Sequence, residues 1–126
     1  MYNFDSIMEK LDWHAPASIQ EEGRFMAEKI SNISVFIQPM DSKYNKNVWE
    51  NCAIVLSKKD DRTLAPYLTE LLMWLQDLNW PGAVCILERM KSFTGDDFKN
   101  ALQKCISQAK ENGDEIWLNT LLEIQE

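Results

Sequence analysis

The chain has 126 residues, 45% of them hydrophobic, which is enough to bury a core of its own, and its four glycines and four prolines are too few for a disordered protein. Its net charge of −7 repels nucleic-acid phosphates and anionic membranes, so a cationic protein is the natural partner. No apolar run is long enough to span a membrane, no export signal is visible, and an odd number of cysteines, three, suits a reducing compartment. We therefore expect a single cytoplasmic domain over residues 1–126.

Two helices are predicted near the N-terminus. A short helix spans about residues 5–11, and Ser18 with Glu21 forms a capping box that starts a second helix, which runs to about Ile30. Gly23 weakens this second helix by about 1 kcal/mol relative to alanine, unless a neighbouring element packs closely against it.

The next segment is less regular. Residues 33–37 form either an extra helical turn or an extended link, and the polar residues 41–46 form a surface loop. A third helix then begins near Val48, with Asn45 or Asn47 as its cap.

A leucine-rich helix follows. Asp60 and Asp61 open it, Pro66 is tolerable because it falls near the first turn, and the helix continues to about Gln76. Leucines recur along it at steps of three and four residues, which places them on one face that must be covered by a neighbour. These leucines are Leu64, Leu68, Leu71, Leu72 and Leu75.

A fifth helix begins almost without a loop. Asn79 is its expected cap, Pro81 falls in its first turn, and it reaches about Lys91. Its apolar stripe consists of Trp80, Val84, Leu87 and Met90. Because so short a turn joins two apolar stripes, the fourth and fifth helices should pack back to back as a hairpin.

The last part of the chain predicts two further helices. A sixth helix starts within Thr94 to Asp97 and ends at Gly113, and the seventh covers about residues 116–124. The fold class is therefore all-α, with three helix pairs after a short N-terminal helix. Trp49, Trp80 and Trp117 open the second helix of each pair as core residues, which favours a HEAT-like stack of hairpins, although a compact helical bundle would give much the same pattern.

Few residues offer catalytic or metal-binding chemistry. His14 is the only histidine, and as a loop residue without evident partners it does not define an active site. The three cysteines are too far apart for a zinc motif and fit the apolar faces of helices. The stretch from Thr94 to Asp97 resembles a cation-binding loop, but helix capping explains it at least as well. We therefore expect no catalytic residues, no metal and no cofactor.

Acidic residues at helix ends are the main candidates for partner binding. In a stack of hairpins the helix ends gather along two rims, and a rim rich in carboxylates attracts a cationic protein. The candidate residues are Asp60, Asp61, Asp77, Asp96 and Asp97. The alternative is that each of these acids only caps its own helix.

Tryptophan provides a second indication of a binding surface. The chain has five tryptophans, and interfaces favour this residue. Trp13 and Trp74 fit their helical stripes less well than the others, and Trp74 lies off the leucine face of its helix. We therefore include Trp74 as a partner-binding candidate that lines a groove or is exposed, although packing against a neighbouring hairpin also explains it.

The run from Pro66 to Ala83 resembles the signature of a small bacterial domain family of unknown function, marked by an LLxWLQDxNWPxA motif. The similarity extends loosely from about Val48 to Met90. It implies a HEAT-like helical fold, and some similar short domains accompany polymorphic toxins of contact-dependent inhibition systems as immunity proteins. No catalytic residues are assigned to that family, so the resemblance implies none here.

Three functional hypotheses follow. The first is an immunity protein that binds one toxin, a basic nuclease by charge, as a monomer in a one-to-one complex and covers its active site. The alternative is a HEAT-like adaptor or regulatory scaffold for another cytoplasmic protein. An enzyme that uses His14 or a carboxylate pair is the third and weakest reading, because no catalytic constellation accompanies these groups.

Overall fold

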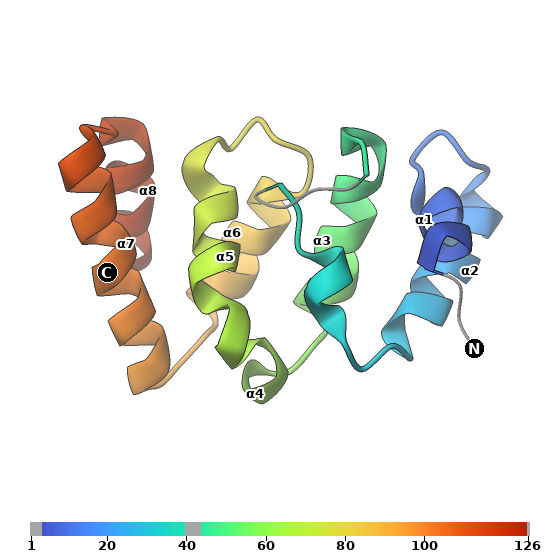
Figure 1. The fold of residues 1–126 in the computed structure, drawn as a ribbon, viewed down its shortest axis with the longest axis horizontal. Helices are drawn as coiled ribbons and strands as arrows, with labels where there is room; N and C mark the ends of the chain where they lie inside the picture. The colour runs from blue at the N-terminus through green and yellow to red at the C-terminus, as the bar shows by residue number, and fades with distance from the viewer. Residues whose placement is uncertain (1–3, 40–43, 126) are drawn as a thin grey trace.

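The structure is a computed structural model that describes residues 4–39 and 44–125, and these residues form a row of packed helices without a strand (Figure 1). The predicted all-α, helical-repeat-like fold is confirmed. The helices are α1 (Phe4–Leu11), α2 (Ala17–Glu28), α3 (Trp49–Ser57), α4 (Asp61–Leu64), α5 (Leu68–Met73), α6 (Ala83–Lys91), α7 (Asp96–Asn112) and α8 (Glu115–Gln125). Short 3₁₀ turns join them, namely η1 (Ile33–Phe36), η2 (Lys46–Val48), η3 (Ala65–Tyr67) and η4 (Trp74–Gln76).

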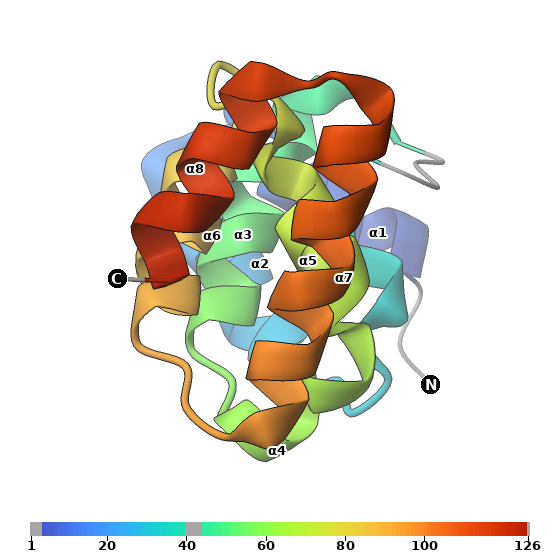
Figure 2. The same cartoon turned by 90° about the vertical axis from the view of Figure 1, so that its left-hand side faces the viewer.

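The helices lie in two layers. In one layer α2 packs on α3, α3 on α6, and α6 on α8, whereas the other layer contains α1, η1, α5 and α7 (Figures 1 and 2). The N-terminal helix belongs to the stack, because α1 packs along α2. At the C-terminal end α7 packs on both α5 and α8. Each helix therefore buries its apolar face mainly against its neighbours, as in repeat proteins.

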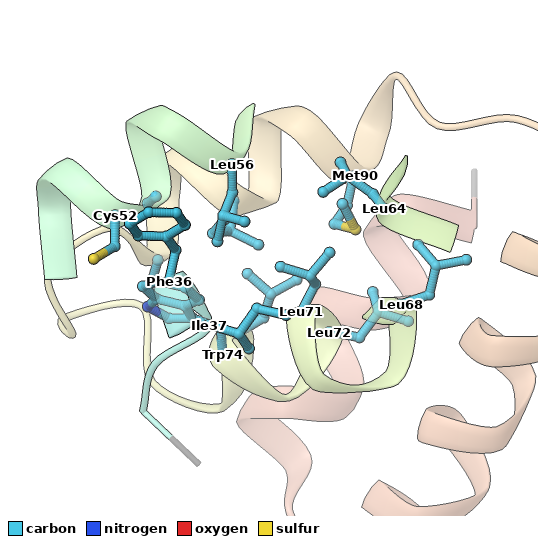
Figure 3. Packing of buried hydrophobic residues seen from close by; sticks show 14 of the residues in the cluster. Phe36, Ile37, Cys52, Leu56, Leu64, Leu68, Leu71, Leu72, Trp74 and Met90 are labelled. Atoms are coloured by element: carbon cyan, nitrogen blue, oxygen red, sulfur yellow. The ribbon is translucent and has the colours of Figure 1, made fainter. Parts of the chain in front are cut away.

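Buried side chains fill the space between the layers. Phe36 of η1, Leu71 of α5 and Met90 of α6 are fully buried, and Figure 3 shows them converging with side chains of α3. Leu64, Leu68, Leu71, Leu72 and Leu75, the predicted leucine face, are all 2% exposed or less. Each such leucine contributes roughly 1.5–3 kcal/mol by leaving water, which makes this segment the centre of the core.

The leucine-rich segment is not the single helix that was predicted, because it consists of two short α-helices, α4 and α5, each followed by a 3₁₀ turn. Pro66 lies within η3, between α4 and α5, and a second 3₁₀ turn, η4, ends the segment. Proline has no backbone N–H to donate to the preceding turn, which explains why the α-helical ladder is interrupted there.

Gly23 is a point of close approach between α1 and α2. A Cβ atom at this position would lie 2.7 Å from the Cβ of Lys10 and 3.2 Å from a methyl carbon of Leu11. From the sequence, Gly23 is expected to weaken its helix unless a neighbouring element packs closely against it. Helix α1 is that neighbouring element.

Several predicted helix signals are confirmed. The 33–37 segment is a helical turn, η1, and the side chain of Asn45 rather than that of Asn47 caps η2. Asp60 caps α4 by accepting a hydrogen bond from the backbone N–H of Thr63 at 2.8 Å. Gly113 ends α7 in a left-handed conformation. Within the predicted polar loop 41–46, residues 41–43 lie outside the described residues.

The predicted capping box at Ser18 is wrong. Helix α2 already begins at Ala17, and the carbonyl of Pro16 accepts the first helical hydrogen bond from Gln20. Ser18 therefore lies inside the first turn, where its side chain cannot act as the N-cap.

The predicted cap at Asn79 and the helical position of Pro81 are also wrong. Helix α6 begins only at Ala83, after a turn in which the Asp77 carboxylate accepts from the N–H of Asn79, and Gly82 occupies the N-cap position with φ +85°. This later start changes which side of α6 faces inward. Val84, expected in the buried stripe, is 57% exposed, while Ala83, Ile86, Leu87 and Met90 are buried.

The three tryptophans expected in the core differ in their environments. Trp49 and Trp117 are 6% and 1% exposed. Trp80 is only partly buried and lies in the turn before α6, where its ring packs edge-on against Trp49 with 6.0 Å between centroids.

Candidate functional site: the α5–α7 groove

A groove runs along the surface between the α4–α5 segment and α7. It consists of three adjoining hollows of about 260, 390 and 280 Å³. The first and second hollows share Ala65 and Asp97, and the second and third share Thr69. Because adjoining hollows share walls, we treat them as one surface and call it the α5–α7 groove.

One stripe of α7 forms a wall of this groove. Its members recur at steps of three and four residues, which places them along one side of the helix. The stripe consists of Asp97, Ala101, Lys104, Cys105, Gln108 and Asn112. Neighbouring residues of α7, such as Phe98 and Leu102, are buried and hold the helix against the core.

The structure brings four of the five predicted acidic residues to one rim of the stack. Asp61, Asp96 and Asp97 line the first hollow of the groove, and Asp60 precedes Asp61 at the start of α4. Two hydrogen bonds from Thr63 lower the pKa of Asp60, and the one from the hydroxyl has a larger effect than the one from the backbone N–H. This end of the groove, with Asp60, Asp61, Asp96 and Asp97, is called the acidic end below.

Asp77 does not belong to this group. It lies in the turn between η4 and α6, which Figure 1 shows at the opposite rim of the stack from α4. The prediction of two rims is thus compatible with the fold, but the five acids do not form a single surface.

Both carboxylate oxygens of Asp61 accept hydrogen bonds from other parts of the fold. One carboxylate oxygen accepts from Nη2 of Arg89 at 2.6 Å, and the other accepts from the backbone N–H of Thr94 at 3.3 Å. Nη2 of Arg89 also donates to the carbonyl of Lys59 at 2.9 Å, and the arginine side chain is only 12% exposed. Asp61 therefore holds together the start of α4, the end of α6 and the loop before α7.

Asp96 and Asp97 are in a different situation. Both are exposed, and among the described residues neither carboxylate has a hydrogen-bond or ion-pair partner. They lie in the first turn of α7, where the helix dipole favours negative charge. These two acids are the part of the predicted set that is open to a partner.

The prediction that Trp74 lines a groove or is exposed is wrong. Its side chain is 0% exposed, and its indole nitrogen donates to the carbonyl of Pro81 at 3.1 Å. Its ring packs beside Gly82, where an added Cβ atom would lie 3.1 Å from the Cζ2 carbon of Trp74. Trp13, the other tryptophan singled out, is 43% exposed.

The opposite end of the groove was missed by sequence reasoning. It is lined by Met73, Gln76, Gln108, Asn112 and the edge of buried Trp117. The one sequence signal for this end of the groove is a polar stripe on α7 beside the apolar stripe that faces the core. Such a polar stripe is typical of any helix face exposed to solvent. The groove becomes visible only when α5 is placed beside α7.

A second acidic hollow, also missed, lies against α1. Asp5, Glu9 and Asp12 line it at helical spacing, together with Tyr44 and Asn45, and its volume is about 350 Å³. The hydroxyl of Tyr44 donates to Asp5 at 2.7 Å, and this hydrogen bond is the main cause that raises the pKa of Tyr44 to about 12.

The remaining reactive groups are scattered. His14 lies with its side chain 74% exposed, 3.2 Å from the carboxylate of Asp12. Burial raises the pKa of the thiols of Cys52 and Cys105 to about 12 and about 11, and it raises the pKa of Cys85. In the described part of the chain, no cluster of three or more His, Cys, Asp or Glu side chains could hold a metal ion.

The fold and the groove define a small all-α protein of helical-repeat type. Within residues 4–39 and 44–125, no helix has the length and apolar character needed to cross a membrane. Residues 48–126 match the family model described as Domain of unknown function (DUF5071), and the chain belongs to this family. No curated protein and no solved structure matches the chain. The match begins just before α3, so it includes the whole groove and leaves α1 and α2 outside.

Proposed function

We propose that this protein acts by binding rather than by catalysis, as a cytoplasmic immunity protein that neutralises a cognate bacterial toxin. It binds the toxin one-to-one as a monomer and covers the active site or the path of the substrate. A basic nuclease is the toxin class whose charge fits best, because carboxylates can occupy positions that otherwise attract nucleic-acid phosphates.

The observation that carries this proposal is the pair of open carboxylates at the acidic end of the groove. Asp96 and Asp97 are exposed and without partners among the described residues, and the net charge of the chain is −7. Such a surface accelerates association with a cationic protein. The resemblance of the Pro66 to Ala83 segment to a family of unknown function adds separate support, because some similar short domains accompany polymorphic toxins as immunity proteins.

The adaptor hypothesis is the second candidate, and the apolar end of the groove favours it. Met73, Cys105 and Trp117 line this hollow and give it a mostly apolar surface that suits a segment of many proteins. In that case the partner is not a toxin, and the protein has no protective effect on cells.

The experiment is co-expression with the toxin domain encoded beside the gene for this protein. Growth should be restored, and the two proteins should purify as a one-to-one complex whose mass is measured by light scattering. The matched control is a toxin inactivated at its catalytic residue, which should still form the complex. A stable toxin complex without protection, or no complex at all, contradicts the immunity proposal.

A separate variant tests the third reading, catalysis. His14→Ala should neutralise the toxin as well as the original protein, because the proposal assigns the histidine no role. A complete loss of protection with an intact complex would instead point to chemistry at this residue.

A further inference from the structure

The two ends of the α5–α7 groove differ chemically. At the acidic end, Asp96 and Asp97 present open carboxylates, which outnumber the one exposed cation of this hollow, Arg62. At the other end, Met73 and the buried Cys105 and Trp117 provide an apolar floor, and the exposed Lys104 lies at its border. A ligand that fills the groove therefore meets negative charge at one end and an apolar surface at the other.

Small side chains keep the middle of the groove open. Ala65, Thr69 and Ala101 line the central hollow, and the one larger aliphatic side chain in its lining, Leu68, is buried in the core. Asp97 lines both the first and the central hollow, so its carboxylate is reachable from within the groove.

Amide side chains border the apolar end. Gln76, Gln108 and Asn112 line it, and Nε2 of Gln108 donates to the side-chain oxygen of Asn112 at 3.2 Å. Each primary amide has two donor hydrogens and an acceptor oxygen, so these groups retain capacity to bind the backbone of a ligand. A polypeptide supplies the alternating N–H and C=O groups that match such a border.

The spacing along α7 sets the size of the ligand. Eight residues separate Asp97 from Cys105, which corresponds to about 12 Å along the helix axis. An extended chain covers that distance with about four residues, and a helix with about eight. A single short segment is therefore long enough to reach both ends.

We infer that the α5–α7 groove binds one segment of a protein partner, with a lysine or arginine at Asp96 and Asp97 and an apolar side chain against Met73, Cys105 and Trp117. This inference rests on the proposed function only in that the protein acts by binding another protein. Charge complementarity favours a basic protein segment as the occupant. The phosphates of a nucleic acid would be repelled by the acidic end, and so would a second copy of this chain, whose net charge is −7.

The experiment uses the full chain and a random dodecamer peptide library displayed on phage, so that no natural partner is needed. Selected peptides should carry a basic residue followed, within about four to eight positions, by an aliphatic or aromatic residue. Synthetic versions of these peptides are then measured by fluorescence anisotropy against groove variants.

Two variants change the groove at partly or fully exposed positions. Thr69→Trp fills the central hollow, and Asp97→Lys reverses the charge at the acidic end; each should weaken the selected peptides by about tenfold or more. The matched controls are Val84→Trp on exposed α6 surface and Glu111→Lys on α7 outside the groove, which should leave binding unchanged. Circular dichroism and thermal unfolding check that all four variants fold.

Three outcomes overturn the inference. In the first, the selection enriches no peptide. In the second, the selected peptides bind the Thr69→Trp and Asp97→Lys variants as tightly as the original chain. In the third, light scattering shows that the original chain is a dimer and that Thr69→Trp abolishes the dimer. Failure of the toxin co-expression experiment leaves these results unaffected, since peptide binding is measured without a toxin. The groove and the immunity role can therefore fail separately.

Discussion

The indole nitrogen of Trp74 lies 3.1 Å from the carbonyl oxygen of Pro81 and donates a hydrogen bond across the turn that joins η4 to α6. A second hydrogen bond fixes the same turn against α3, because the N–H of Gly82 donates to a carboxylate oxygen of Glu50 at 2.6 Å. A Cβ at Gly82 would lie 2.7 Å from the Cβ of Ala53, so the turn has no room for a side chain. A segment that looks like a free connection is thus part of the core.

Trp74→Phe should lower the free energy of unfolding by about 2 kcal/mol, because it leaves a small cavity and removes the indole donor of the hydrogen bond to the Pro81 carbonyl. Urea unfolding followed by circular dichroism measures this change. Trp13→Phe, at an exposed tryptophan, is the control and should cost less than about 0.5 kcal/mol. Equal effects of the two substitutions would show that Trp74 is not buried as described.

Gly23→Ala should destabilise the protein, although helix propensity alone favours alanine by about 1 kcal/mol. The new methyl group would press on Lys10, including its backbone carbon at 3.2 Å, and overpacking of this kind costs about 1–3 kcal/mol. Thermal and urea unfolding measure the net change. The control is Ser18→Ala in the same helix, which should leave stability nearly unchanged because Ser18 is not the N-cap. A gain in stability for Gly23→Ala would contradict the close approach of α1 and α2.

The cap at Asp60 should make part of the stability depend on pH. Its folded pKa is lowered from the ordinary value of 3.8 by the hydrogen bonds from Thr63, so its stabilisation is present above pH 3.8 and is lost as the pH falls through the lower folded pKa. Asp60→Ala should therefore be less stable than the original chain at neutral pH, and the difference should shrink below pH 3.8. Asp60→Asn, an uncharged cap, is the control, and its difference from Asp60→Ala should not change with pH.

The cysteines should react with iodoacetamide in a fixed order. Raising the pKa of Cys52 from 9.0 to about 12 lowers its thiolate fraction at neutral pH about a thousandfold, and Cys105 is also almost completely buried. Cys85 is partly exposed and should be modified first. Mass spectrometry of the intact protein over time measures this order, and labelling in denaturant shows that all three thiols are present. Early modification of Cys52 would contradict the packing of α3.

Reversal of the charges at Asp96 and Asp97 to lysine should slow association with the toxin by about tenfold or more at low salt and flatten its salt dependence. Stopped-flow kinetics across a salt series measures both effects. Glu111→Lys, at an exposed position of α7 outside the groove, is the control and should have the smaller effect. Asp61→Lys is not suitable for this test, because it breaks the contacts with Arg89 and Thr94. Unchanged association of the Asp96 and Asp97 double variant would place the interface elsewhere.

The sequence by itself determined the features that depend on neighbours along the chain. The leucine face from Leu64 to Leu75 follows from spacing at three and four residues, the cap at Asp60 from a hydrogen bond three residues away, and the end of α7 from the conformational freedom of Gly113. These interactions form within one or two turns of helix, so the order of residues is sufficient to predict them. The all-α class followed from the same local patterns.

Tertiary structure decided the features in which distant segments compete with local preferences. The indole of Trp74 turned inward because the Pro81 carbonyl and the core around Ala53 could enclose it, and α6 began at Ala83 because the preceding turn was fixed against Glu50. The four acids met at one end of the groove because the start of α4 and the start of α7 lie at the same rim of the stack. The contacts of Gly82 with Glu50 and of Thr94 with Asp61 join residues about thirty positions apart, and no local pattern encodes them.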